Sequence, residues 1–304
     1  MLDRYVEQVR LLVKMLPYIA KEDSFALKGG TAINLFYRNL PRLSIDIDLT
    51  YLPIEDRDTS LRHIDEALGR IMDAISKSHQ TFRLRRIAGG GNGDTRIMVG
   101  KGQTQIKIET SPVSRGAVHT PVRMVASDAA VEQFGFTEMP VLAFEDLYGG
   151  KLHAALDRQH PRDLFDIKLL YENEGLTDDL FKTFMVYVAS SGRPMHELLA
   201  PNCITLEILY AEEFSGMTRD PVDLQELEDV RLRLYSDISQ GLKGDIAVFL
   251  LSLHDAVPDF SLIGRPDAEQ LPAVRWKLMN LEKLKRNNPA KHAEQRELLA
   301  ALFQ

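Results

Sequence analysis

The stretch 26–52 constrains the fold of this chain most, because it joins a Gly-Gly turn to two aspartates on an otherwise apolar segment. Asp46 and Asp48 are two residues apart, so on a strand both carboxylates point to one face, while Ile47 and its aliphatic neighbours point into the protein. The pattern predicts a strand–helix–strand unit with an acidic open face. Its expected elements are a strand over 25–28, a turn at Gly29-Gly30, a helix over 31–37 and a strand over 45–49.

The same stretch offers ligands for a cation and for a phosphate. Two adjacent carboxylates repel each other unless a cation lies between them. Oxygen ligands on a rigid strand suit Mg²⁺ or Mn²⁺, and Mg²⁺ completes its shell with water and substrate phosphates. A Gly-Gly turn before a helix presents backbone N–H groups to phosphate. Alone, the glycines could form an ordinary tight turn and the aspartates a solvated strand edge; together they favour a metal and phosphate site.

A third carboxylate is expected on a later strand. Strands are predicted over 81–88, 94–100 and 103–111, and the glycine run 89–93 between the first two predicts a hairpin turn rather than a phosphate loop. On the third strand Gln105, Lys107 and Glu109 share one face. Glu109 is therefore the candidate third acid, and the alternative is an exposed Lys-x-Glu surface pair.

From about residue 125 the pattern predicts helices only, after a loop over 112–124. In the segment FEDLYGGKLHAALDR, Lys151 falls on the inward stripe of the helix, where a charge needs a partner. A triphosphate would supply that partner, and so would a nearby acid. The next helix is predicted to start at Pro161, with Asp163 and Asp166 on one face; Asp163 also suits the positive end of the helix. Further helices are expected over about 176–190, 194–200, 222–240, 242–254 and 270–303.

Two blocks carry a resemblance to a known family. They are Lys28-Gly29-Gly30-Thr31 with Arg42-Leu43-Ser44-Ile45-Asp46-Ile47-Asp48-Leu49, and the block of Lys151, Leu152, His153, Ala154, Arg158, Arg162, Asp163 and Asp166. This combination resembles nucleotidyltransferases of the polymerase β type and, within them, the AbiEii/AbiGii toxin family of MenT-like type IV toxins. Fifteen residues separate Gly30 from Asp46, more than is usual in the broad superfamily.

The resemblance implies an α+β fold: a polymerase β-like nucleotidyltransferase core over 1–140, with a mixed or antiparallel sheet, and an all-helical domain over 141–304 that completes the cleft. It implies attack by a hydroxyl on the α-phosphorus of an NTP. The implied metal ligands are Asp46, Asp48 and Glu109. The implied catalytic residues are Asp46, Asp48, Glu109, Lys151 and Asp163. The implied nucleotide-binding residues are Gly29, Gly30, Thr31, Ser44, Lys151 and Asp166, and Ser44 is also a candidate for self-modification.

The implied acceptor is the 3′ end of tRNA, which would make the protein a growth-inhibiting toxin with a role in phage defence and a cognate antitoxin of the AbiEi type. Two alternatives remain open: a small-molecule nucleotidyltransferase of the antibiotic-modifying kind, and an NTP-binding regulatory protein without transfer activity. An acidic acceptor pocket would favour the first, and for it the nine acids against three Arg in 205–237 could be cited.

Charge and composition exclude some classes of function and indicate a cellular compartment. The net charge of −7 argues against a general nucleic-acid coat, but residues 81–123 hold eight Lys/Arg against two acids, and 272–292 hold six against one. Such basic segments suit an RNA backbone, although the second could be solvated surface. The single Cys203 excludes an internal disulfide and a cysteine zinc site. No apolar run is long enough to span a membrane, so we expect a cytoplasmic protein.

Overall fold

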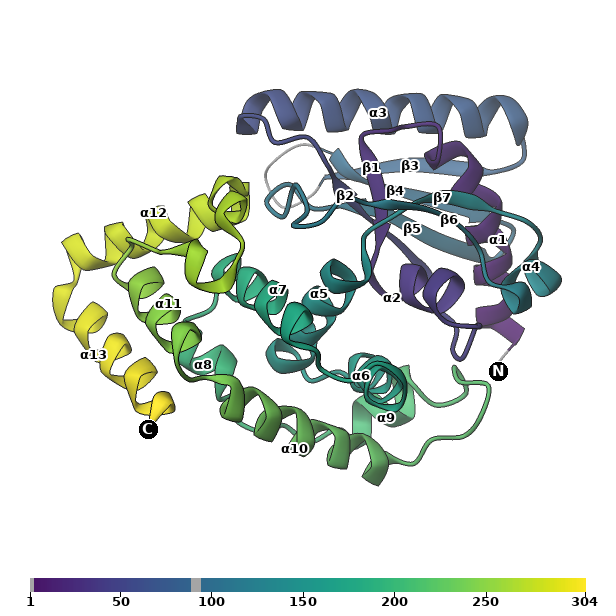
Figure 1. The fold of residues 1–304 in the computed structure, drawn as a ribbon. Coiled ribbons are helices and arrows are strands. Elements are labelled where there is room, and N and C mark those ends of the chain that lie inside the picture. The colour runs from purple at the N-terminus through teal and green to yellow at the C-terminus, as the bar shows by residue number, and fades with distance from the viewer. Residues whose placement is uncertain (1–2, 89–93) are drawn as a thin grey trace. The chain divides into compact units, whose positions relative to one another are not determined.

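The computed structural model describes residues 3–88 and 94–304 (Figure 1), and the turn expected at 89–93 lies outside them. The chain divides into two compact units. The first contains Met1–Leu147 and Ser215–Pro221; the second contains Tyr148–Phe214 and Val222–Gln304.

The first unit is built on a seven-stranded sheet with the order β3-β4-β5-β2-β1-β7-β6. The pairs β2/β5 and β1/β7 are parallel and the others antiparallel, so the expected mixed sheet is confirmed. The strands are Phe25–Lys28 (β1), Asp46–Tyr51 (β2), Arg83–Ala88 (β3), Asp94–Lys101 (β4), Thr104–Thr110 (β5), Val122–Val125 (β6) and Glu138–Val141 (β7).

Two long helices cover one face of this sheet. Helix α1 (Asp3–Ile19) packs on β5, and α3 (Arg57–Ser78) packs on β4 and lies along the sheet in Figure 1. The side chains that they bury alternate along the central strands, as predicted, and each contributes about 1.5–3 kcal/mol by leaving water. These buried strand residues are Ile47, Leu49, Ile97, Val99, Ile106 and Ile108. The alternate residues, including both strand aspartates, therefore face the other side.

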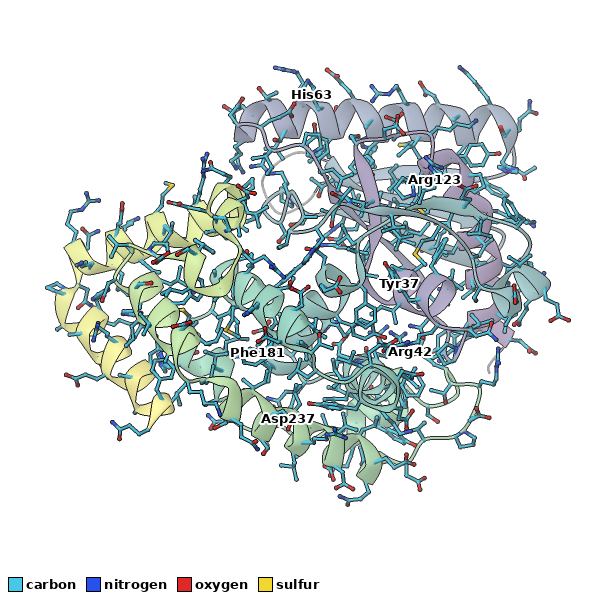
Figure 2. All side chains as sticks on the ribbon, viewed as in Figure 1. Tyr37, Arg42, His63, Arg123, Phe181 and Asp237 are labelled. Carbon is cyan, nitrogen blue, oxygen red and sulfur yellow. The ribbon has the colours of Figure 1, made fainter. Side chains whose placement is uncertain are left out.

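The Gly-Gly turn leads directly from β1 into a helix. Gly29 has a φ of +72°, in the left-handed region, and is the first residue of α2 (Gly29–Ala32), which continues as a π-helical turn over Ile33–Tyr37. The helix thus starts two residues earlier than predicted. Tyr37 ends it and donates its hydroxyl to the carbonyl of Leu142 at 3.0 Å (Figure 2).

The prediction of a loop followed only by helices after residue 111 is wrong. Strand β6 starts at Val122, helix α4 spans Asp128–Phe134, and β7 pairs with β6 and with β1. Each of these two strands has only four residues and lies at the end of the sheet, so neither is long enough to show a clear alternation.

A short segment from the C-terminal half belongs to the first unit. The backbone N–H of Leu43 donates to Met217 at 2.9 Å and that of Arg219 to Pro41 at 2.8 Å. These bonds flank an isolated bridge between Arg42 and Thr218. They fix the loop that precedes Asp46, at the start of β2.

The second unit is helical, as expected. Helix α5 (Phe144–Asp157) begins in the first unit and continues into the second. The other α-helices are Pro161–Asn173 (α6), Asp178–Ala189 (α7), Met195–Leu199 (α8), Glu207–Glu213 (α9), Leu224–Gly241 (α10), Asp245–His254 (α11), Pro272–Asn287 (α12) and Pro289–Ala300 (α13). Of these, α9 was not predicted, and the single helix expected over 270–303 is wrong, because Pro289 starts a separate helix there. Among the described residues no helix combines the length and the apolar character needed to cross a membrane.

Candidate active site

The strand register gathers the three predicted carboxylates on one face of the sheet. Asp48 lies directly opposite Glu109 on the parallel neighbour β5, and Asp46 lies opposite Lys107. Directly opposite residues point to the same side of a sheet, so the face that carries these acids, called the carboxylate face below, is the one opposite α1 and α3. Asp46, Asp48 and Glu109 are each half-buried.

Basic side chains partner the third acid. Arg96 Nε approaches Glu109 Oε1 at 2.5 Å and Lys107 Nζ approaches Oε2 at 2.7 Å. Burial raises the pKa of Glu109, but the hydrogen bonds from Lys107 and Arg96 outweigh this and hold the pKa below its usual value. Burial lowers the pKa of Lys107, but Glu109, Asp46 and Asp48 together outweigh this and raise that pKa above its ordinary value. Lys107 thus supplies positive charge to all three carboxylates.

The two glycines bring backbone against the carboxylate face. A Cβ on Gly29 would lie 2.8 Å from Asp48 Oδ2, and a Cβ on Gly30 would lie 2.7 Å from Arg42 Nη2 and 2.9 Å from Ser44 Oγ. Any larger residue would therefore displace an Asp48 oxygen or the Arg42 guanidinium. The Gly-Gly turn is required where it occurs, immediately beside a predicted metal ligand.

Thr31, Ser44 and Arg42 complete the surroundings of this turn. Thr31 donates its hydroxyl to the carbonyl of Asp46 at 2.5 Å, which ties the start of α2 to the start of β2. Ser44 lies two residues before β2, which begins at Asp46. Arg42 is buried to 2% exposure (labelled in Figure 2) and donates to the carbonyl of Leu43 at 3.0 Å.

The helical unit holds the second predicted cluster. Lys151 on α5 is 6% exposed, and its Nζ lies 2.7 Å from Asp163 Oδ1 and 3.0 Å from Asp166 Oδ2, both on α6. Arg158 donates to Asp163 through Nε at 2.6 Å and Nη2 at 3.0 Å. Burial raises the pKa of Asp163, but Lys151 and Arg158 outweigh it and hold that pKa far below its usual value.

This cluster answers the question that the sequence left open for Lys151. Lys151 has two acidic partners within the chain, Asp163 and Asp166. A phosphate contact of Lys151 stays a prediction. The neighbouring Gly149 and Gly150 face the ring of Tyr187, since a Cβ on either would lie within 3.3 Å of it. These glycines are thus explained by helix packing in the second unit.

Sequence reasoning assigned no site role to several basic residues, although Lys28 and Arg158 belong to the two family blocks. Lys28, directly opposite Asp48 on β1, and Lys107 and Arg96 surround the carboxylates. Arg158 is 58% exposed at its side chain although Asp163, its partner, is fully buried. The alternation that selected Glu109 also places Lys107 on its face, and the Lys-x-Glu pair named as the alternative does form, half-buried rather than exposed. The partner of Arg158 depends on how two helices pack.

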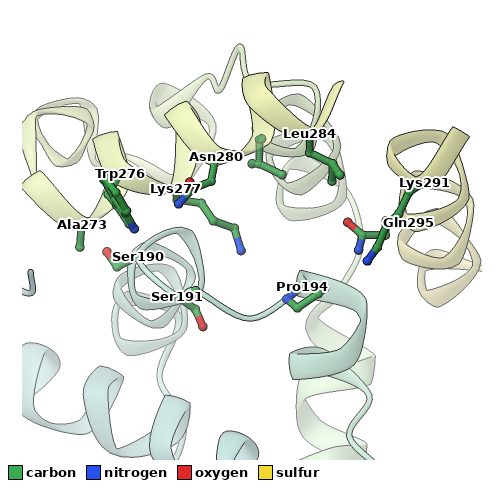
Figure 3. A pocket seen from close by; sticks show the side chains of 12 residues that line it. Ser190, Ser191, Pro194, Ala273, Trp276, Lys277, Asn280, Leu284, Lys291 and Gln295 are labelled. Carbon is green, nitrogen blue, oxygen red and sulfur yellow. The ribbon is translucent and has the colours of Figure 1, made fainter. Parts of the chain in front are cut away.

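A separate hollow of about 180 Å³ lies in the helical unit between α12, α13 and the turn after α7 (Figure 3). Trp276, Lys277 and Lys291 are among its lining residues. Lys277 is buried and donates to the carbonyl of Arg193 at 2.6 Å, and burial lowers its pKa to about 8. None of the residues predicted for catalysis or nucleotide binding lines it.

The residues at the carboxylate face fit a hard divalent cation. Asp46 and Asp48 offer carboxylate oxygens on one face of a rigid strand, which is the ligand chemistry that Mg²⁺ requires. The attraction of Lys107 to all three acids shows that this spot already favours a positive charge. Glu109 can join the two aspartates as a ligand, because each of its oxygens accepts from one basic group, Arg96 or Lys107, and has a second lone pair.

Fold and site together define a class of protein. Over 99% of this chain and 94% of the other, the structure resembles MenT4, a nucleotidyltransferase toxin from Mycobacterium tuberculosis, with a TM-score of 0.57 and 15% sequence identity. That likeness establishes the fold alone, a mixed sheet with C-terminal helices.

The family follows from the sequence match. The family model described as nucleotidyl transferase AbiEii toxin of type IV toxin–antitoxin systems matches residues 10–280. The chain belongs to this family, so the resemblance noted from its motifs is confirmed, and it is a nucleotidyltransferase. An NTP substrate and an antitoxin partner follow from membership. No curated protein matches this chain in sequence.

Proposed function

We propose that this protein is a metal-dependent toxin that transfers a nucleoside monophosphate from an NTP to the 3′ end of tRNA and so blocks translation and growth. The observation that carries the proposal is how closely the Gly29 backbone approaches Asp48: a Cβ added to Gly29 would lie only 2.8 Å from Asp48 Oδ2. A turn suited to phosphate and a carboxylate suited to metal thus share one spot, as NTP chemistry requires.

Asp46 and Asp48 would hold the divalent ions, Mg²⁺ or Mn²⁺. When bound, these ions activate the attacking hydroxyl and neutralise charge on the leaving pyrophosphate. Glu109 completes the ligand set or accepts the hydroxyl proton. Its lowered pKa supports the first of these roles, because a general base works best with a pKa near the working pH.

The Gly-Gly turn would bind the phosphates of the NTP. Backbone N–H groups of Gly29, Gly30 and Thr31 lie at the start of α2, where the helix also favours negative charge. The buried Arg42 guanidinium beside Gly30 and the Ser44 hydroxyl add charge and a hydrogen-bonding group. Ser44 is also the proposed position of self-modification.

The Lys151 cluster would supply a second phosphate contact from the helical domain. Asp163 and Asp166 hold Lys151, and the exposed guanidinium of Arg158, anchored on Asp163, would be the group that meets the phosphate. Asp163 then acts as a positioning residue for both cations. In this proposal residues 141–304 form the helical domain and 1–140 the nucleotidyltransferase core.

The biological part of the proposal concerns the acceptor and the partner. The basic strands of 81–123 suit an RNA backbone. We propose a cytoplasmic toxin active in phage defence, neutralised by an antitoxin of the AbiEi type.

The test combines purified protein, Mg²⁺, total tRNA and each α-labelled NTP in turn. Asp48→Asn is the matched control, since it keeps the side-chain shape and removes the charge needed for metal. Label is expected in tRNA with one NTP and not with the variant.

Other outcomes would overturn parts of the proposal. Label that remains on the protein would point to self-modification at Ser44 and away from tRNA. Label found only in a small-molecule acceptor would establish the antibiotic-modifying alternative, and NTP binding without any transfer would establish a regulatory protein. Equal transfer by Asp48→Asn would refute the metal-site assignment.

A further inference from the structure

The carboxylate face does not end at the acids but continues across the sheet to its β3 edge. The pairing register aligns Asp46 on β2 with Lys107 on β5, Lys107 with Met98 on β4, and Met98 with Arg85 on β3. Directly paired residues point to the same side. One straight row of side chains therefore leads from a predicted metal ligand to an exposed arginine on the edge strand.

A second row runs parallel to the first. Arg83 pairs with Gly100, and Gly100 pairs with Gln105. Gly100 is buried, with the side chain of Arg83 beside it, and Arg83 and Gln105 are exposed. A hollow of about 410 Å³ lies here, lined by residues of both rows, among them Arg83, Arg85, Met98 and Gln105.

The charge of this surface is positive at every ionisable position away from the acids. Arg83 donates to the carbonyl of Gly102, which is an uncharged partner. Arg85 is exposed on the same side, and Lys107 lies between it and Asp46. Met98 lies between Arg85 and Lys107 in the first row and is half-buried. Its side chain gives an apolar, adaptable surface against which a nucleobase can lie.

The dimensions fit a short stretch of single-stranded nucleic acid. Arg85 and Asp46 are three strand spacings apart, about 14 Å at about 4.8 Å per spacing. A stacked strand advances about 3.4 Å per nucleotide, so the row spans about four nucleotides. A strand lying along it with its backbone on Arg83 and Arg85 would bring its end to Asp46.

We propose that the surface formed by Arg83, Arg85, Met98, Gln105 and Lys107 binds the sugar–phosphate backbone of the last few nucleotides of the RNA acceptor and delivers its 3′ hydroxyl to Asp46 and Asp48. This inference rests on the proposed function and assigns the acceptor its path on the sheet. It also separates the acceptor from the NTP, whose phosphates belong at the Gly-Gly turn.

The test measures steady-state transfer from labelled NTP to total tRNA by the variant Arg83→Gln/Arg85→Gln. Two lost phosphate contacts at about 0.7 log units each predict a KM for tRNA about 25-fold higher at 0.1 M salt. The slope of log KM against log salt should become shallower by about 1.4. The KM for NTP should not change, because neither arginine lies beside Gly29 or Gly30.

Arg86 provides the matched control on the same strand. It directly follows Arg85 in sequence and therefore points to the other face, where it pairs with Asp65 of α3. Arg85→Gln and Arg86→Gln therefore change the net charge equally, and only the first should raise the KM for tRNA. Thermal unfolding of each variant checks that the fold is kept.

The outcomes separate this inference from the proposed function. If the wild-type protein labels tRNA and the Arg83/Arg85 variant has the same KM for tRNA as Arg86→Gln, the acceptor path is wrong and the proposed function stands. A change confined to the KM for NTP would likewise overturn the path and assign the surface to the nucleotide. If the wild-type protein labels no RNA, the proposed function itself fails, and the acceptor path falls with it.

Discussion

Replacing Asp163 by Asn tests the Lys151 cluster most directly, because the change keeps the shape of the side chain and removes its charge. The carboxylate accepts three hydrogen bonds, from Lys151 Nζ and from two nitrogens of Arg158. An Asn side chain has one acceptor oxygen, and its NH₂ group would face a donor. Asp163 is fully buried, so water cannot replace the lost partners.

The magnitude follows from which partners remain. Removing one member of a buried ion pair costs about 3–5 kcal/mol. Lys151 keeps Asp166 at 3.0 Å, and Arg158 has its head in solvent, where an ion pair contributes about 0–1 kcal/mol. We therefore expect the lower end, about 3 kcal/mol of unfolding free energy.

The single Trp276 allows the helical unit to be followed by itself. It lies on α12, in the same unit as Asp163, so its fluorescence in urea reports unfolding of that unit. With an m value of about 2 kcal/mol/M, the midpoint for Asp163→Asn should fall by about 1.5 M. Asp178→Asn is the control, because the Asp178 carboxylate is 82% exposed in its pair with Lys182 and its loss should cost about 1 kcal/mol or less.

The pH dependence gives an independent check. The folded pKa of Asp163 lies below the unfolded value of 3.8, so its ion pairs stabilise the protein fully above that value. The difference in stability between wild type and Asp163→Asn should be constant from pH 5 to pH 8 and shrink progressively as pH falls below 3.8. A midpoint shift no larger than that of Asp178→Asn, or a difference that persists unchanged at acid pH, would refute the reasoning.

Four further predictions concern the other sites. Gly29→Ala should lose both activity and stability, because a φ of +72° costs about 1–2 kcal/mol for alanine and the new Cβ displaces Asp48. Gly175→Ala is the control: its φ is +73° but the space around it is open, so it should lose only the backbone energy. Thermal unfolding and transfer assays compare the two variants. Mg²⁺ should raise the Tm of the wild type but not of Asp48→Asn, and equal shifts would remove Asp48 from the metal site. Lys151→Ala should weaken NTP binding measured by calorimetry, and unchanged affinity would leave Lys151 a structural residue. The rate at which Lys277 reacts with an amine-acylating reagent should rise with a midpoint near pH 8, because burial lowers the pKa of Lys277 to about 8. Mass spectrometry of labelled peptides measures this rate. A midpoint near pH 10.5, the ordinary value for lysine, would contradict the prediction.

Local patterns in the sequence determined much of this fold and part of its candidate site. Alternation along 45–49 and 103–111 predicted which face of each strand is buried, because a strand displays its period over a few residues. The same rule put Asp46 and Asp48 together and chose Glu109 as the third acid. The requirement for Gly29 and Gly30 was likewise visible, since a turn into a helix with a close backbone approach favours glycine.

Tertiary structure alone decided which charges meet. Arg96 engages Glu109 because β4 and β5 pair in one register, and a register joins residues that no local pattern connects. Lys151 meets Asp163 and Asp166 through the packing of α5 on α6. The strands β6 and β7 and the segment Ser215–Pro221 were not predicted for the same reason. Periodicity records whether a residue is buried, whereas its partner is set by long-range pairing that no local pattern contains.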